Sequence, residues 1–420
     1  MTPVLGGATL PAELAARVRG AAAELERRGI GPGDRVAIDG GDVLAWFLGA
    51  DLRGAAALVV EPRWSARERA AVLGDARPLA TVSGPVVGPV VGAVAGSDAG
   101  SVVGTVVSSG ADGAAGADAE APFYLATTSG SSGAPKVLQR SRRSWLRSFE
   151  ALGRVPGPVL VAGPLSSSLF LFGALHALWC GAELRLAPRL TPDALRGIAT
   201  VHVVPAMLPD LLGSDVDTIV CGGAHVPQAL RRPGLVEYYG SAEHSLIAVR
   251  RDGALRPVPG VDLEVRAGEL WVRSPLAVDG RLRAGVLDPA PEWTSVGDRV
   301  DIVDGALTVH GRGSATVLTG GLLVAAEEVE AVLRQVPGVL DVVVAGTPHP
   351  RLGAVVTAVV EGEPSLAALR AAAADGLEPR KRPRIWLRAD EIPRTPAGKP
   401  ARAALTAGLA AGGLDAEPLR

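Results

Sequence analysis

The sequence predicts an α/β protein with a large N-terminal domain of αβ layers around parallel sheets and a small α+β C-terminal domain. Three observations indicate this class. The chain has 420 residues, which is too long for one simple core. Hydrophobic residues make up 48% and charged residues 20%, as in globular proteins. Short apolar runs alternate with helix-like segments over much of the first 250 residues, which is typical of parallel sheets with crossover helices.

The elements of the N-terminal half follow from this alternation. Apolar spacing and turn residues predict helices over 11–29, 42–53 and 65–74, and strands over 33–38 and 55–62. Residues 82–122 are mainly Gly, Ala, Val, Ser and Asp, so we expect a loose connection there. A strand at 123–126 then precedes a polar loop, and a helical stretch is expected from Arg140. Strands and helices alternate again from 155 to 249, with helices expected before and after the strand at 201–206.

After residue 260 the sequence pattern indicates short strands, and after residue 313 it indicates a compact segment of mixed strands and helices. In that last segment we expect helices at 327–336 and 365–376, strands at 341–345 and 354–361, then a polar loop and a final helix. The predicted domains are therefore 1–311 and 315–420, joined by a hinge at 312–314.

Composition excludes several classes of protein. The net charge of −2 argues against a broad nucleic-acid-binding surface. The two cysteines, Cys180 and Cys221, exclude a disulfide scaffold and a multi-cysteine zinc site, and they fit a reducing compartment. No secretory signal begins the chain, and Gly163-Pro164 interrupts the best uncharged run, 155–182. We therefore expect a cytoplasmic protein without a membrane span.

The loop TTSGSSGAPK at 127–136 is the first candidate site. Glycines let backbone N–H groups approach phosphate oxygens, hydroxyls add donors, and a lysine neutralises charge. The loop therefore favours polyphosphate binding, although it lacks the GxxxxGK[ST] pattern and a flexible surface loop is the alternative. The candidate ligands are Thr128, Ser129, Gly130, Ser131, Ser132, Gly133 and Lys136.

This loop resembles the phosphate loop of the adenylate-forming superfamily, which contains acyl-CoA synthetases, peptide-synthetase adenylation domains and luciferases. Five further motifs of that family follow in order, and the resemblance covers most of residues 11–410. They stand here as Gly222-Gly223-Ala224, Tyr239-Gly240-Ser241-Ala242-Glu243, Gly297-Asp298 followed by Gly311-Arg312-Gly313-Ser314, and Pro393-Arg394-Thr395-Pro396-Ala397-Gly398-Lys399.

The resemblance implies a role for each motif. Tyr239 and the 222–224 turn would contact adenine, Asp298 the ribose hydroxyls, and Arg312 the ribose and phosphate. Glu243 would help to hold Mg²⁺, with a solvated surface charge as its alternative, and Lys399 would be catalytic. The implied fold adds a small distorted barrel to the first domain and makes the C-terminal domain mobile.

The implied reaction is ATP-dependent activation of a small-molecule carboxylic acid to an acyl-adenylate, followed by transfer to CoA. Ala242, Val137 and Ser314 depart from the family pattern, as does the 320–326 loop. A carrier-protein thiol or an amine therefore stays open as the acceptor, and a non-catalytic nucleotide- or acyl-binding protein is the alternative from another class. Residues 166–172 and 203–207 are expected to line an apolar acid pocket, with Leu169, Phe170, Phe172 and Met207 in its wall.

The small number of lysines among the basic residues supports a special role for the lysines in the motifs. Of 42 basic residues only Lys136, Lys381 and Lys399 are lysines, and two of these three lie in the motifs where the chemistry needs a point charge. The basic run at 380–384 fits either CoA phosphates or a solvated face. The histidines His176, His202, His225 and His244 do not have metal-ligand spacing and are expected in the core or in pockets.

Overall fold

The computed structural model describes residues 10–64, 66–86, 119–128, 135–224, 226, 228–312, 316–319, 322–377, 379–394 and 400–419. The chain divides into two compact units. The first contains 1–262 and 273–292, and the second contains 263–272 and 293–420.

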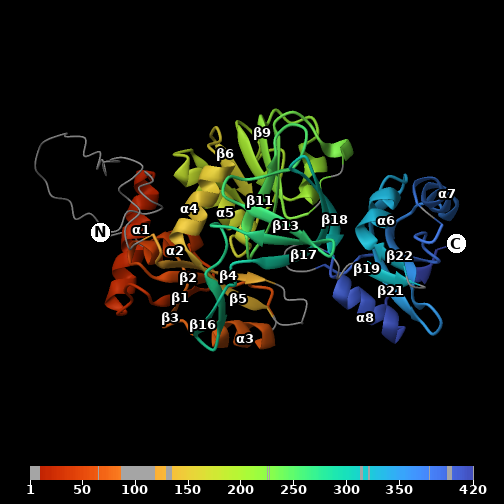
Figure 1. Ribbon diagram of the computed structural model, residues 1–420. Coiled ribbons are helices and arrows are strands. Elements are labelled where there is room, and N and C mark those ends of the chain that lie inside the picture. Colours follow the sequence, from red (N-terminus) through yellow and green to blue (C-terminus); the bar gives the residue numbers. More distant parts are fainter. Residues whose placement is uncertain are drawn as a thin grey trace, which may run out of the picture. The chain divides into compact units, whose positions relative to one another are not determined.

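The first sheet of the first unit has the strand order β16-β15-β5-β4-β2-β1-β3 (Figure 1). Strands β1, β2, β3 and β4 are parallel, whereas β5, β15 and β16 join antiparallel. The strands are β1 (Arg35–Ile38), β2 (Ala56–Val59), β3 (Ala80–Val82), β4 (Pro122–Thr128), β5 (Lys136–Ser141), β15 (Gly280–Arg283) and β16 (Val286–Pro289).

Helices cover both faces of this sheet. Helix α2 (Val43–Leu52) is buried along nearly its whole length because it lies between α1 (Ala12–Arg27) and strands β1 and β2. The two helices approach closely at Gly49, where an added Cβ would lie 2.6 Å from the Cβ of Ala21. Strand alternation directs Ala37 and Leu58 to the other face, where they form a core with Val72 of α3 (Ala66–Ala76).

The second sheet has the order β12-β11-β10-β9-β8-β6-β7, and its strands from β10 to the edge strand β7 are parallel. Its strands are β6 (Val159–Ala162), β7 (Leu184–Ala187), β8 (Thr200–Val203), β9 (Thr218–Gly222), β10 (Leu235–Ser241), β11 (Ser245–Arg250) and β12 (Arg256–Pro257). Helices α4 (Arg142–Leu152) and α5 (Ser168–Trp179) pack between the two sheets (Figure 1). Trp145 of α4 contacts both Tyr124 of β4 and Phe172 of α5.

Three local predictions for this unit are wrong. The helix expected from Arg140 begins at Arg142, because residues 136–141 form β5 and pair with both β4 and β15. The helix expected between β7 and β8 is a series of turns in a short connection that Pro188 and Pro192 interrupt. The helix expected after β8 is a 3₁₀ segment, Pro205–Leu211, which contains Pro209.

The second unit contains two sheets. An antiparallel sheet of order β13-β14-β17-β18 stands where the small barrel was expected. The other sheet has the order β20-β19-β22-β23-β24, with β21 paired to β22. The strands are β13 (Asp262–Arg266), β14 (Glu269–Arg273), β17 (Thr294–Val303), β18 (Ala306–Arg312), β19 (Thr316–Thr319), β20 (Leu322–Ala325), β21 (Val339–His349), β22 (Gly353–Gly362), β23 (Ile385–Ala389) and β24 (Glu417–Pro418).

Alternation along β21 and β22 gives this last sheet two buried faces. Val342 and Val344 pack with helices α6 (Ala326–Leu333) and α7 (Leu366–Gly376), whereas Val343 packs with Leu405 of α8 (Arg402–Ala411). Strand β23 replaces part of the polar loop expected after α7, and it lies parallel to β22.

The α/β class and the α+β C-terminal segment are therefore confirmed. Residues 263–272 and 293–311 belong to the second compact unit. This division differs from the predicted domain boundary at 312–314. Residues 87–118 of the expected loose connection lie outside the described residues. Within the part of the chain that the structure describes, no helix is long and apolar enough to cross a membrane.

Candidate active site

The predicted phosphate loop joins two paired strands. Thr128 ends β4 and Lys136 begins β5, and the two residues lie directly opposite each other in the antiparallel ladder. Residues 129–134, which include the predicted ligands from Ser129 to Gly133, lie outside the described residues. The loop therefore leaves and re-enters the sheet at one point, which Thr128 and Lys136 mark. Lys136 is half-buried and makes no ion pair with the described residues.

The second motif lies at the carboxyl ends of β9 and β10, which are adjacent and parallel. Gly222 pairs with Tyr238, and an added Cβ at Gly222 would lie 2.2 Å from the Tyr238 ring. Gly223 has a φ of +93°, which an L-residue rarely adopts. The backbone conformation thus favours glycine at 223, and the Tyr238 ring favours it at 222, so the 222–224 turn lies beside the strand segment that carries Tyr239. Ala224 is exposed at this edge.

The turn between β10 and β11 carries Glu243. Gly240, at an irregularity in the ladder, lets the strands close, because its missing Cβ would lie 1.8 Å from the carbonyl oxygen of Ser245. The Ser241 hydroxyl accepts a hydrogen bond from the His244 amide at 3.2 Å. The carbonyl oxygen of Glu243 accepts from the Val278 amide at 2.8 Å. The half-buried Glu243 side chain makes no hydrogen bond or ion pair with the described residues.

Two hydrogen bonds fix the turn before α5, where part of the acid pocket is predicted. The Ser166 hydroxyl donates to a carboxylate oxygen of Glu61 at 2.7 Å. The hydroxyl oxygens of Tyr124 and Ser168 lie 2.8 Å apart, and burial raises the pKa of Tyr124 to about 12. The start of α5 and the turn before it are thus tied to Glu61, two residues after β2, and to Tyr124 of β4. Sequence reasoning missed both ties because no local pattern links residues so far apart.

The two phenylalanines of the predicted pocket lie on opposite faces of α5. Phe170 packs with Met207, Val161 and other apolar residues, on the side predicted for the acid. Phe172 instead lies in the aromatic core, with its ring centroid 4.9 Å from Phe149. The structure therefore removes Phe172 from the predicted wall and leaves Phe170 and Met207 in it.

The ribose-binding residues predicted from the sequence lie in the second unit. Asp298 on β17 is 6% exposed and pairs with Arg312 at the end of β18. Gly297 precedes it with a φ of +75°. The two candidate residues, which are 14 positions apart in the sequence, are therefore neighbours across one antiparallel ladder.

Lys399, the residues 395–398 before it, residues 313–315 of the hinge region and Gly320-Gly321 lie outside the described residues. Their roles stay predictions. His225 lies outside them as well.

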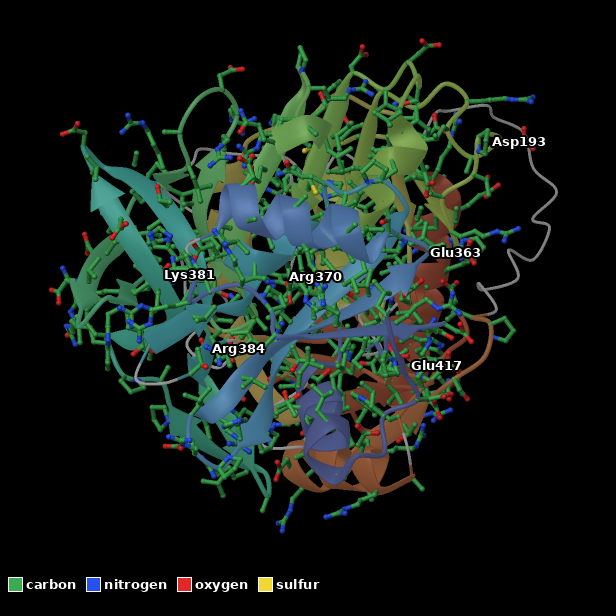
Figure 2. All side chains as sticks on the ribbon, turned by 90° about the vertical axis from the view of Figure 1, so that its right-hand side faces the viewer. Asp193, Glu363, Arg370, Lys381, Arg384 and Glu417 are labelled. Carbon is green, nitrogen blue, oxygen red and sulfur yellow. The ribbon has the colours of Figure 1, made fainter. Side chains whose placement is uncertain are left out.

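The basic run at 380–384 is partly engaged within the second unit. Lys381 forms two bonds with the Glu328 carboxylate, at 2.7 and 2.9 Å, and Arg382 donates to two carbonyl oxygens at the end of α7. Figure 2 shows Lys381 and Arg384 on a face of this unit that also carries the acidic Glu363 and Glu417. The face therefore has mixed charge.

His176, His202 and His244 are buried, as predicted, and Cys221 is buried as well. His176 and His202 are buried with ring centroids 5.5 Å apart, and burial lowers the pKa of both, to about 4 for His176. Burial also raises the pKa of the Cys221 thiol. Among the described residues, no three His, Cys, Asp or Glu side chains gather as a metal site.

Comparison with known proteins identifies the family. The chain matches the AMP-binding enzyme family over residues 12–280 and the AMP-binding enzyme C-terminal domain over 328–399. The first match spans more than half of the chain, so the chain belongs to the AMP-binding enzyme family. The resemblance to adenylate-forming enzymes is confirmed, and so is the prediction of an enzyme.

Individual proteins agree with this assignment. The uncharacterized acyl-CoA ligase YhfT of Bacillus subtilis is 29% identical over 407 residues, covering 86% of this chain and 84% of that protein. The amide bond synthetase McbA of Marinactinospora thermotolerans is 26% identical, with a TM-score of 0.77 and 96% of each chain covered. ATP-bound MatB of Rhodopseudomonas palustris shares the fold, with a TM-score of 0.78 at 22% identity over 96% of this chain and 94% of that one.

Proposed function

We propose that this enzyme activates a carboxylic acid with ATP, releasing pyrophosphate, and passes the acyl group to CoA as a thioester. The observation that carries the proposal is that both parts of the AMP-binding enzyme family, the large domain and its C-terminal domain, follow each other in one chain. The curated name of YhfT, an acyl-CoA ligase similar over most of its length, supports CoA as the acceptor.

In the first step the acid's carboxylate oxygen attacks the α-phosphorus of ATP, and the bond to pyrophosphate breaks. Two anions must meet, so positioning and positive charge dominate the catalysis. The loop between Thr128 and Lys136 would bind the β- and γ-phosphates, and Tyr239 with the 222–224 turn would hold adenine. Asp298 and Arg312 would hold the ribose, since a carboxylate offers acceptors for two hydroxyls. Lys399 would neutralise charge that develops on the α-phosphate.

The chain's residues fit the Mg²⁺ that such a reaction uses. Glu243 is a half-buried carboxylate that makes no contact with a cation among the described residues, and Mg²⁺ prefers one or two carboxylates together with substrate phosphates. When bound, the ion would neutralise charge on the phosphate oxygens. Ala242 supplies no hydroxyl for the α-phosphate, so Glu243 is the residue of this turn that we propose for the ion.

In the second step the acceptor attacks the acyl carbonyl carbon, and AMP leaves. The similarity to the amide bond synthetase McbA and the altered 320–326 loop favour an amine as the second candidate acceptor. A carrier-protein thiol is the third. Parallel assays with CoA, amines and a carrier protein bearing its pantetheine arm distinguish the three by the product formed.

Carboxylate-dependent exchange of labelled pyrophosphate into ATP tests the first step. We expect exchange with at least one acid in a panel of short, branched, aromatic and long-chain acids, with hydroxylamine trapping the same acid. The apolar packing of Phe170 with Met207 supports apolar or aromatic acids. A wild-type enzyme that exchanges no pyrophosphate with any acid would instead support the non-catalytic binding protein.

A further inference from the structure

Arg140 is a buried cation that the predicted motifs do not include. It is the largest fully buried side chain in the described part of the chain, with 1% of its surface exposed. It lies on β5 four residues after Lys136, so strand alternation puts both residues on the same face. Burying an arginine costs free energy that an apolar side chain of similar volume avoids. The hydrogen bonds that the guanidinium makes must therefore offset the cost of burying Arg140.

Those groups belong to the backbone around Glu243. Nη2 donates to the carbonyl oxygen of Ala242 at 2.8 Å, directly before Glu243 in its turn. Nη1 donates to the carbonyl oxygen of Leu276 at 2.5 Å and to the Ser144 hydroxyl at 3.1 Å. Two residues after Leu276, the Val278 amide donates to the carbonyl oxygen of Glu243. One guanidinium thus joins β5 to both main-chain segments that fix Glu243.

The charge balance keeps Arg140 ionised. Burial lowers its pKa to about 10, and the negative charges of Asp279 and Glu243 oppose that shift. Asp279 is itself held to β5, since its amide donates to the carbonyl oxygen of Gln139 at 2.9 Å. The Glu243 carboxylate thus lies near a fixed positive charge and is not neutralised by direct contact with it.

We propose that Arg140 is a positioning residue that orients the Glu243 carboxylate for the Mg²⁺ of the bound nucleotide. It couples that carboxylate to the strand that begins at Lys136. The inference rests on the proposed function, because Mg²⁺ at Glu243 is part of it. A planar guanidinium donates in two directions at once, whereas a single ammonium cannot span both carbonyl groups.

The test compares Arg140→Met, Arg140→Lys and Arg142→Met. Arg142 is a matched control, because it is a buried arginine two residues away whose guanidinium is paired with the Asp51 carboxylate at 2.7 Å. We expect the Mg²⁺ concentration for half-maximal pyrophosphate exchange to rise about tenfold in Arg140→Met, as for a loss of about 1.4 kcal/mol of coupling. Arg140→Lys should recover part of this, and Arg142→Met should change thermal stability with a Mg²⁺ midpoint within about twofold of wild type.

Hydrogen exchange supplies a readout that does not need activity. The amides of His244 and Val278 should exchange at least tenfold faster in Arg140→Met and at the wild-type rate in Arg142→Met. Equal Mg²⁺ midpoints in the two methionine variants, or unchanged exchange at these amides, would overturn the role of Arg140 while the proposed function stands. A wild-type enzyme without pyrophosphate exchange would overturn both.

Discussion

At the scale of single residues, several arginines and the lysine Lys136 differ in the contacts that they make. Its arginines serve as structural forks: Arg142 binds Asp51, Arg232 donates to three carbonyl oxygens, and Arg140 joins three segments. A planar guanidinium suits such multiple contacts. Among the lysines, Lys381 is paired with Glu328, whereas Lys136 has no ion pair in the described residues. These three arginines are therefore fixed by several contacts, whereas Lys136 keeps a charge that no ion pair among the described residues holds.

The first prediction concerns Lys399. Replacing Lys399 with alanine should lower the rate of pyrophosphate exchange by about 10²–10³, as for the loss of one preorganised donor, while ATP binding changes little. Rapid-quench measurement of adenylate formation checks this. Lys381→Ala is the control, because its partner is Glu328 and this step needs no CoA. A Lys399→Ala enzyme within twofold of the wild-type rate would remove the catalytic role.

The buried histidines predict acid sensitivity of the fold. The pKa of His176 is lowered from 6.5 to about 4, first by burial and then by the charges of Arg154 and Arg251, against a hydrogen bond to Gly153 that raises it. The unfolded chain therefore binds more protons than the native one between pH 6.5 and 4, so stability is full above pH 6.5 and falls as the pH drops.

The expected loss is about 1.4 kcal/mol of unfolding free energy per pH unit for this histidine. Urea unfolding at pH 7, 6 and 5 measures it. His176→Phe, which keeps a ring in the aromatic core, should flatten the dependence, and His310→Gln, at an exposed site, should not. An unchanged slope in His176→Phe would exclude His176 as the source.

At the scale of elements, the site depends on where strands end. Sequence reasoning found most strands and helices because apolar alternation and helical spacing are local signals. It placed the helix start at Arg140, two residues early, because pairing of 136–141 with β4 and β15 is a long-range effect. It also missed β23, whose pairing with β22 outweighs its polar surroundings.

In the candidate site, too, residues in local motifs could be predicted from the sequence, and long-range contacts could not. Motif residues such as Gly222 and Tyr239 could be found in the sequence, and the structure places them at one sheet edge. Arg140 and the Tyr124–Ser168 contact could not be found, because their partners are 102 and 44 residues away. Such supporting contacts leave no periodic or local signal.

The carboxyl ends of strands β9 and β10 are the subject of a third prediction. In Gly222→Ala the new methyl group would lie 2.2 Å from the Tyr238 ring, so the ring must move, and we expect this to disturb the adjacent Tyr239. Overpacking of this kind typically costs about 1–3 kcal/mol. We expect a lower unfolding midpoint and a higher KM for ATP. Gly31→Ala, where no atom lies within 4 Å of the added group, should change neither, and a wild-type midpoint in Gly222→Ala would contradict the argument.

At the scale of the whole molecule, the predicted nucleotide ligands are divided between two compact units. Thr128, Lys136, Tyr239 and Glu243 belong to the first, and Asp298, Arg312 and Lys399 belong to the second. A reaction with two chemical steps places different demands on such an arrangement. In the proposed reaction, adenylate formation would need Lys399 at the phosphates, whereas thioester formation would need room for the acceptor. We therefore propose that the segment after residue 314 rotates about 312–314 between the two steps, as domains commonly do at short hinges.

A proline in the hinge separates the two steps. Proline fixes φ near −65°, whereas glycine permits both signs of φ, so Gly313→Pro should hold the hinge near one conformation. If that conformation is the adenylating one, pyrophosphate exchange should stay within about threefold of wild type, while transfer of preformed acyl-adenylate to the acceptor slows tenfold or more. Single-turnover assays of each step measure the two rates separately. Slowed pyrophosphate exchange with near-normal acyl transfer would show that the proline holds the thioester-forming conformation instead, and the hinge would still distinguish the two steps. Equal effects on both rates would show that residues 312–314 are not where the motion occurs.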